Sequence, residues 1–297
     1  MKARNGSAVL WLLVIGLVAF VIFNVFSKAD VFKGFKLIHK VATNVTTGGV
    51  PVTSEGGGVS VNEPKPIPPL NVSPSDLSPL YKKVRIGSVT APSPFPGTGG
   101  QFTLFADYSL KDAVDVTGWT VIGNKGGTVS VPQAISDYNP NMYSQIRSDI
   151  MLDPGGIVYV YGSESALNNN IRLNKCTGYL NERYNMNPIL PNECPLINDS
   201  QITLLSGQCQ NYLRSLSACV TPKAGELNLI GSGFEEACRV LINTQNQGSC
   251  YNNHRLDAGF FEKEWRAWNG NSLPFDMSHD RLILRDKNGL VVDEYTY

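Results

Sequence analysis

The sequence predicts a mainly β protein: an antiparallel β-sandwich that is interrupted by a helical, disulfide-linked insertion and preceded by a single transmembrane helix. Three observations predict this architecture. An uncharged apolar run lies near the N-terminus, short period-two runs follow a Pro- and Gly-rich stretch, and all six cysteines fall within 75 residues that have a helical period. At 297 residues, with 42% hydrophobic and 17% charged residues, the chain is long enough to bury a core.

The apolar run near the N-terminus predicts the transmembrane helix. Residues 8–26 are 19 residues without a charge, and a helix of about 20 residues crosses a hydrocarbon core of roughly 30 Å. Residues 1–7 then form a short cytoplasmic N-terminus. The alternative is a secretory signal that is cleaved near Ala29, because small residues occupy positions 27 and 29.

The orientation of this helix depends on two conflicting signals. Lysines at positions 28, 33, 36 and 40 follow the span, and a positive-inside count places the C-terminal side in the cytoplasm. The clustered cysteines favour an oxidising compartment instead. Because apolar residues are interleaved with these lysines, the segment can lie along anionic headgroups of the outer face, and we predict an extracytoplasmic C-terminal domain.

The chain continues with a tether and a β-rich region. Residues 27–80 comprise the juxtamembrane segment and a Pro-, Gly-, Ser- and Thr-rich stretch with too few large apolar residues for a core, which predicts a disordered tether. In residues 81–163, short β-branched or aromatic runs alternate with turn residues, as in an antiparallel sandwich. The expected strands lie within 84–89, 101–110, 114–122, 127–132 and 157–163.

The last 17 residues predict a closing β-hairpin of the same sandwich. Residues 281–297 contain two alternating runs about the turn Asp286–Gly289, in which Asn-Gly suits a positive φ. Calcium binding is the alternative for this turn, but the remaining ligands of an EF-hand loop are missing. Another turn is predicted at Asp153–Gly156, where Pro-Gly allows the chain to reverse into the next strand.

Residues 164–280 form the predicted helical insertion. The first amphipathic helix has a stripe of Leu205, Cys209, Tyr212, Leu213 and Leu216, followed by Cys219 and Val220. The second begins at a capping box of Ser232 and Glu235 and has one face made of Phe234, Ala237, Cys238, Leu241 and Ile242.

A third helix is predicted in residues 257–268. Phe261, Trp265 and Trp268 share its inward face at helical spacing. The tryptophans are expected in a small disulfide-linked core, and stacking on a sugar is the alternative.

The six cysteines predict three disulfides in an oxidising compartment, because their number is even and they are clustered. They are Cys176, Cys194, Cys209, Cys219, Cys238 and Cys250. A zinc site is the alternative, but the sequence has no C-x-x-C motif and only His254 is close.

Helix geometry limits the fifteen pairings of these cysteines. Cys209 and Cys219 on one continuous helix would lie about 15 Å apart, whereas a disulfide needs Cα atoms within about 7 Å. If the two amphipathic helices form an antiparallel hairpin, Cys219 pairs with Cys238 near its turn and Cys209 pairs with Cys250 at its open end. Cys176 then pairs with Cys194.

The runs at residues 102–127, 152–163 and 280–297 together resemble the lamin-tail domain, an immunoglobulin-like β-sandwich of nuclear lamins and of many bacterial surface and secreted proteins. The most specific match is Gly118-Trp119, since the family sets such a tryptophan into its core. The resemblance covers about 100 residues, and the insertion at 164–280 departs from it. The whole plan is similar to membrane proteins of small-genome candidate-phylum bacteria. The resemblance implies scaffolding or binding, and it implies no catalytic residue.

Charge and motifs exclude several function classes. The first 40 residues hold six of the 25 Lys and Arg residues and one of the 25 Asp and Glu residues, so the remainder has 19 positive and 24 negative side chains. This acidic balance argues against a nucleic-acid partner. No P-loop, H-E-x-x-H or G-x-S-x-G motif is present, and we expect no cofactor and no metal.

The favoured function is therefore a membrane-anchored, extracytoplasmic interaction module that binds a protein or an envelope polymer through its insertion. The alternative is a surface hydrolase with a site between the insertion and the sandwich. It would use His279 with Asp276 and Asp280, or His254 with Asp257, as base and orienting group. A cleft in which ionisable groups converge would favour the enzyme.

Overall fold

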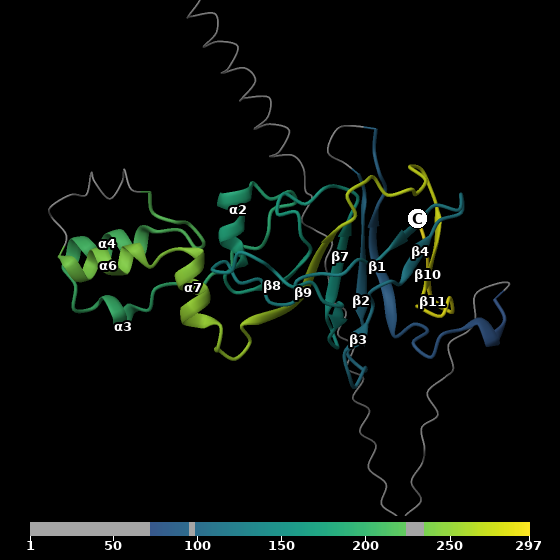
Figure 1. Cartoon of the computed structure of the whole chain (residues 1–297), viewed down its shortest axis with the longest axis horizontal. Helices are drawn as coiled ribbons and strands as arrows, with labels where there is room; N and C mark the ends of the chain where they lie inside the picture. Colours follow the sequence, from purple (N-terminus) through teal and green to yellow (C-terminus); the bar gives the residue numbers. More distant parts are fainter. Residues whose placement is uncertain (1–71, 95–98, 224–234) are drawn as a thin grey trace, which may run out of the picture. The chain divides into compact units, whose positions relative to one another are not determined.

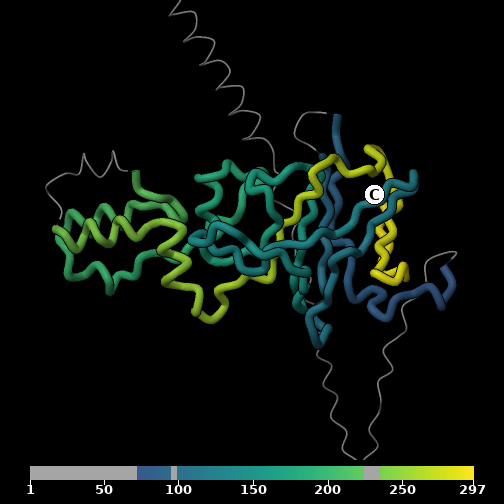
Figure 2. Tube along the Cα trace, in the orientation of Figure 1, coloured from purple at the N-terminus to yellow at the C-terminus, as the bar shows by residue number. Residues whose placement is uncertain are grey.

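The structure is a computed structural model that describes residues 72–94, 99–223 and 235–297. This part of the chain contains two β-sheets, a two-stranded ladder and several short helices, so the prediction of a mainly β protein with helices is confirmed (Figure 1). Three disulfides are also present, and Figure 2 shows the path of the chain. The predicted membrane span at 8–26 lies outside these residues. Within them, no helix has the length and apolar character that crossing a bilayer requires.

One sheet has five strands in the order β1-β2-β7-β9-β8. Their bounds are β1 Val84–Thr90, β2 Gln101–Ala106, β7 Ile157–Tyr161, β9 Phe261–Trp268 and β8 Ile171–Asn174. The pairs β1–β2, β2–β7 and β9–β8 are antiparallel, whereas β7 and β9 are parallel. The sheet is therefore mixed, and not purely antiparallel as the sequence predicts.

The other sheet has four strands in the order β11-β10-β4-β5. Their bounds are β11 Val291–Thr296, β10 Arg281–Arg285, β4 Thr120–Ile122 and β5 Thr128–Ser130. The closing hairpin β10–β11 pairs with β4, with Leu284 opposite Val121, and this confirms that it belongs to the same sheet as strands before residue 163 (Figure 1). Its turn has a positive φ at Gly289, and Asp286 accepts hydrogen bonds from the backbone of Asn288 and Leu290.

The two sheets share one apolar core, and we call them together the two-sheet body. Alternate residues of β1, β2, β7 and β9 meet alternate residues of β4, β5, β10 and β11, as period two requires. The core cluster contains Val84, Ile86, Phe102, Leu104, Ala106, Val116, Trp119, Val121, Val129, Val131, Ala134, Ile150, Leu152, Val158, Val160, Trp265, Ala267, Leu273, Phe275, Leu282, Leu284 and Val292. The short ladder of β3 (Val114–Asp115) and β6 (Met151–Leu152) adds Leu152.

The predicted third helix is wrong, because residues 261–268 form strand β9. Trp265 and Ala267 face the core of the two-sheet body, while Trp268 belongs to a second cluster on the other face of the sheet. Both faces of this strand are covered, so every residue from 265 to 268 is buried. Because both faces of the strand are buried, its sequence does not alternate between apolar and polar residues. Its aromatic residues, which favour strands, happen to be spaced as they would be on one face of a helix.

Two predicted boundaries also change. The folded part begins before residue 81, since Ser78 and Lys82 donate backbone hydrogen bonds to Val291 and Val292, and η1 (Pro74–Asp76) precedes them. The predicted insertion at 164–280 is not separate from the sheets, since β8 and β9 come from it. Residues 175–260 between these two strands are called the helical segment below.

The helical segment consists of short helices. They are η2 Thr177–Tyr179, α2 Leu180–Tyr184, α3 Asp199–Ile202, α4 Gly207–Ser215, α6 Glu236–Asn243 and α7 Gln247–His254. The predicted stripe of α4 is buried against α6, with Cys209 and Leu213 in one small cluster with Cys238 and Ile242. The first two predicted helices are thus present, although α4 ends at Ser215.

Candidate functional site

All six cysteines form disulfides, and the described part of the chain contains no free cysteine. The observed pairs are Cys176–Cys250, Cys194–Cys219 and Cys209–Cys238. The three predicted pairs, Cys219–Cys238, Cys209–Cys250 and Cys176–Cys194, are therefore wrong. The exclusion of a Cys209–Cys219 bond is correct.

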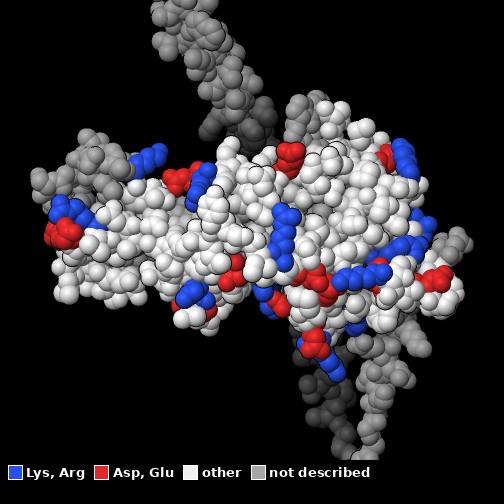
Figure 3. Space-filling model, viewed as in Figure 1, with Lys and Arg blue, Asp and Glu red and all other residues white. Residues whose placement is uncertain are grey.

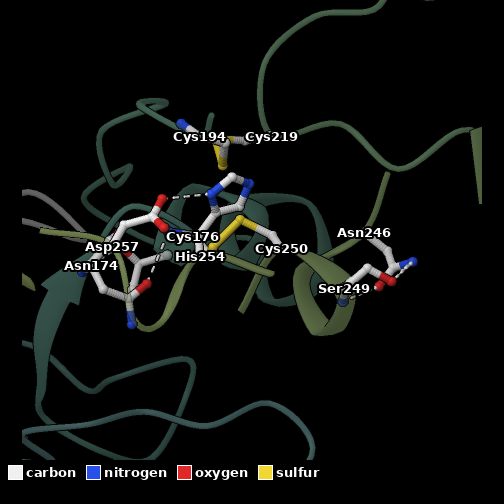
Figure 4. The surroundings of a disulfide bond; sticks show 10 residues. Asn174, Cys176, Cys194, Cys219, Asn246, Ser249, Cys250, His254 and Asp257 are labelled. Atoms are coloured by element: carbon white, nitrogen blue, oxygen red, sulfur yellow. Dashed lines mark hydrogen bonds and ion pairs between the residues drawn. A yellow bond between two sulfur atoms is a disulfide. The ribbon is translucent and has the colours of Figure 1, made fainter. Parts of the chain in front are cut away.

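The error follows from where α4 ends. The sequence predicts a continuous helix to Cys219, but Leu216 is extended and Cys219 has a φ of 62°, so the chain leaves the helix axis. Cys219 reaches Cys194, and Cys209 is free to face Cys238 on α6. The Cys176–Cys250 bond joins the segment after β8 to α7 and lies beside the Cys194–Cys219 bond (Figure 4).

The predicted capping box is not present as expected. Ser232 and Phe234 lie outside the described residues, and Glu235 is itself the N-cap of α6 without a side-chain bond to that helix. Its carboxylate instead accepts hydrogen bonds from the backbone and hydroxyl of Ser206, at 2.7 and 2.9 Å. These bonds lower the pKa of Glu235 and join the starts of α4 and α6.

Gly118 and Trp119 lie at the entry to β4. Gly118 has a φ of 76°, which glycine adopts without strain, and it donates a hydrogen bond to Val131 at 2.8 Å. This turn directs the Trp119 ring into the core of the two-sheet body, where it is 2% exposed. The pair therefore has a packing role.

The histidine and aspartate candidates behave differently from one another. At the first site, Asp280 is buried and accepts backbone hydrogen bonds from Asn124, Arg281 and Asp276, so it organises a loop. Asp276 pairs with Lys125, whose ammonium, together with the Ser278 and His279 backbone, lowers the pKa of this carboxyl to about 2. Both carboxylates are therefore occupied by structural bonds.

At the second site, His254 Nδ1 is 2.8 Å from Asp257 Oδ2. The imidazole follows Cys250 by one turn on α7 and points toward Asp257 (Figure 4). It lines a polar groove of about 680 Å³ between α3 and α7. The hydrogen bond described for its ring is the one with Asp257, and no hydroxyl or thiol among the described residues is placed on its other nitrogen as a nucleophile. The described residues therefore provide a base and an orienting group at this site but place no nucleophile beside them.

The two tryptophans that could stack on a sugar are core residues. Trp265 is 1% exposed and Trp268 is 6% exposed. Their predicted burial is confirmed, but the predicted disulfide-linked core is wrong: Trp265 lies in the core of the two-sheet body and Trp268 in the second cluster, and neither cluster contains a cysteine.

A further hollow, lined by side chains from remote segments, lies where a loop of the two-sheet body meets the helical segment. Two cavities of about 430 Å³ each share Pro140, Asn141 and Arg183, and we call them the junction cleft. One continues along α2 and the start of α7 past Glu182 and Gln247. The other is lined by aromatic and amide side chains, namely Tyr138, Tyr143, Tyr184, Gln145 and Asn169.

Hydrogen bonds hold the loop of the junction cleft against α7. The Tyr251 hydroxyl donates to Asp137 at 2.9 Å, and Asn141 donates to Asn252 at 3.1 Å. A Cβ at Gly248 would stand 2.7 Å from Asn141 Oδ1, so a larger residue at this position would displace the Asn141 side chain. The cleft is therefore built by contacts between segments more than 100 residues apart.

The electrostatics of the junction cleft are mild. Glu182 and Arg183 contribute opposite charges, and the Glu182 carboxylate already accepts the backbone N–H of Thr221 at 3.0 Å. Burial and a hydrogen bond with Tyr184 raise the pKa of Tyr138 to about 12, and burial followed by the Glu182 charge raises the pKa of Tyr179. The phenols thus stay neutral, and charges of both signs are interspersed on the face shown in Figure 3.

Sequence reasoning did not find this cleft. The sequence feature that could have indicated the cleft is the segment 137–147, which is rich in Asn, Tyr and Gln. In the structure this loop exposes Met142, Tyr143 and Ile146. Exposed apolar residues on a loop are not explained by core packing. Among the described residues, no group of three or more His, Cys, Asp or Glu side chains is placed to hold a metal ion.

Comparisons with known protein families, with characterised proteins and with solved structures found no match to this chain.

Proposed function

We propose that the protein is a membrane-anchored, extracytoplasmic interaction module of the lamin-tail type, in which an immunoglobulin-like β-sandwich presents a binding surface to a protein or an envelope polymer. The observation that carries this proposal is the presence of three disulfides within one helical segment. Such bonds are typical of proteins outside the reducing cytosol. They favour an extracytoplasmic domain beyond the apolar run at 8–26.

The arrangement of the two-sheet body supports the lamin-tail resemblance. Gly118-Trp119 delivers its ring into the common core, and the hairpin β10–β11 closes the sheet beside β4. Strands β8 and β9, which flank the helical segment, are additions to this plan. The residues that match the family thus have structural roles, which favours scaffolding or binding.

The junction cleft supports binding over hydrolysis. Its described lining contains one carboxylate, from Glu182, beside Arg183, and within that lining there is no pair of carboxylates of the kind that acid–base catalysis uses. His254 and Asp257 line or border a different groove, without a nucleophile described on the imidazole. The surface hydrolase therefore remains the weaker alternative.

Protease treatment of intact cells tests the location. The full chain carries one epitope tag at each end, and the membrane permeability of the cells is monitored with a cytoplasmic marker protein. We expect added protease to remove the C-terminal tag while the N-terminal tag stays protected and in the membrane fraction. Protection of both tags until lysis would overturn the proposal. Loss of the N-terminal tag during export, with the C-terminal domain released, would show cleavage near Ala29 and not an anchor.

A further inference from the structure

The junction cleft contains a buried hydrogen-bond acceptor without a partner. Gln247, the first residue of α7, is 9% exposed and lines the cavity next to Arg183. Its Oε1 atom is buried and accepts no hydrogen bond within the part of the chain that the structure describes. A buried amide oxygen without a donor is costly, so this position is suited to an O–H or N–H group of a ligand.

The cleft is prepared for a ligand before the ligand arrives. Gln145 donates hydrogen bonds to the backbone oxygens of Asn139 and Met142, at 2.7 and 3.1 Å, and so fixes the loop internally. The bonds Tyr251–Asp137 and Asn141–Asn252 fix the same loop to α7. A site that is already ordered loses less conformational entropy when it binds.

The chemistry of the lining favours a neutral ligand with many hydroxyl groups. The opposite charges of Glu182 and Arg183 provide no net attraction for a phosphate or an ammonium ion. The Asn246 amide is used to cap α7, and the Asn141 NH2 group donates to Asn252. The amide oxygens of Asn141 and Gln247 can accept from a ligand, which matches the donor hydroxyl groups of a sugar. Tyr143, which is fully exposed at the rim, offers a flat ring to the apolar face of a sugar.

A peptide fits the cleft less well. Peptides are usually bound by an open strand edge or by apolar pockets for anchor side chains. The described lining of the cleft comes from loops and from the ends of α2 and α7, and amide, phenol and charged groups dominate it.

We propose that the junction cleft binds a neutral oligosaccharide segment of an extracellular polymer, with a sugar hydroxyl donating to Gln247 Oε1 and a sugar face packing on Tyr143. This inference deepens the proposed function and rests on it, because it names the ligand class of the interaction module. Arg183 and Asn141 border both cavities. They would contact the part of the oligosaccharide that passes from one cavity to the other.

Calorimetric titration of the full chain tests the inference. The protein is kept in a detergent without a sugar headgroup, and the probes are chitotetraose and cellotetraose as neutral tetrasaccharides, tetragalacturonate as an acidic one, and an extended tetrapeptide. We expect saturable binding of at least one neutral probe and at least tenfold weaker binding of tetragalacturonate and of the peptide.

Two variants locate the site. Gln247→Ala removes the buried acceptor and is expected to lower the affinity for the neutral probe about tenfold, which is the effect of one lost hydrogen bond to a ligand. Tyr143→Ala changes a fully exposed ring, which leaves the fold intact, and is expected to weaken it severalfold. Gln133→Ala, at an exposed amide outside the cleft, is the matched control and should bind as the wild type does.

Three results would overturn the inference. The first is no saturable binding of either neutral probe by protein that retains its three disulfides. The others are wild-type affinity of both cleft variants for the neutral probe, or tighter binding of the acidic probe or the peptide than of the neutral probes. The proposed function fails separately. If protease removes the domain from intact cells but the protein binds neither neutral probe, only the proposed ligand class is refuted. If the domain is protected inside the cell, the proposed location is refuted, whatever the protein binds in the calorimeter.

Discussion

The two-sheet body and the helical segment belong to one chain but are stabilised in different ways. Twenty-two buried residues form a single apolar cluster between the two sheets. In the helical segment the cluster around α4 and α6 has only five buried residues, two of them cysteines in a disulfide. The body can therefore rely on burial of apolar area, whereas the segment needs covalent bonds.

Helix length explains the same difference. The described α-helices of the helical segment have between four and nine residues, and isolated helices shorter than about 12–15 residues are marginal in water. The disulfides close loops with sequence separations of 74, 25 and 29 residues. A chain-entropy model gives about 4.5 kcal/mol for the longest loop and about 3.5 kcal/mol for each of the two shorter ones, and less when one bond already restricts another. The comparison shows that disulfides can stabilise a surface-forming segment whose own apolar core is too small to keep it folded.

The largest expected effect comes from deleting residues 281–297. The deletion removes β10 and β11, leaves β4 and β5 as a two-stranded ladder and exposes the common core, so the two-sheet body should unfold completely. Near-UV circular dichroism and a thermal scan measure this. A truncated protein that melts as the full chain does would show that the hairpin is not part of the body.

Matched leucine substitutions compare the two cores directly. Leu284→Ala in the two-sheet body, where the side chain is 0% exposed, should lower the free energy of unfolding by about 3–5 kcal/mol. Leu213→Ala on α4, where the side chain is 4% exposed, should leave the main transition unchanged because the disulfides hold this cluster locally. Denaturant unfolding measures both variants. Equal losses would mean that the two regions unfold as one unit.

Removing the Cys209–Cys238 bond tests the role of the disulfides. Replacement of both residues by alanine should destabilise the packing of α4 on α6 by about 3–4 kcal/mol in the chain-entropy model. Amide hydrogen exchange should then speed up in α4 and α6 and stay slow in β2 and β7. Faster exchange in these strands as well would contradict the separation of the two regions.

The smallest expected effect is a pH dependence of the two-sheet body at the Lys125–Asp276 pair. The pKa of Asp276 is about 2 in the folded protein, below its usual 3.8, so the pair stabilises the fold above about pH 4 and this contribution is lost as the pH falls toward 2. Lys125→Met should raise the pKa of Asp276 and reduce the fall of Tm in this range.

NMR titration of the Asp276 carboxyl together with thermal scans measures the effect. Lys111→Met, at an exposed lysine elsewhere on the surface, is the control and should leave the titration unchanged. An unaltered pKa in the Lys125 variant would assign the shift to the backbone donors of Ser278 and His279 alone.

The sequence by itself determined the elements whose signal is local. Period-two runs of apolar, β-branched and aromatic residues placed β1, β2, β7, β10 and β11, and the Asn-Gly pair placed the turn of the closing hairpin. The stripe of Cys209 and Leu213 placed α4, and the even, clustered cysteines indicated disulfides. These features depend on neighbouring residues and on side-chain period, which are visible in a single chain.

Only the tertiary structure decided the pairings over long distances. The sequence did not show that α4 stops before Cys219, that β9 would lie parallel to β7 with both faces covered, or that the loop at Asn141 would meet Gln247. The physical reason is the same in each case. Packing against residues far along the chain outweighs helix and strand preferences of a few tenths of a kcal/mol per residue, and the junction cleft exists only after those contacts have formed.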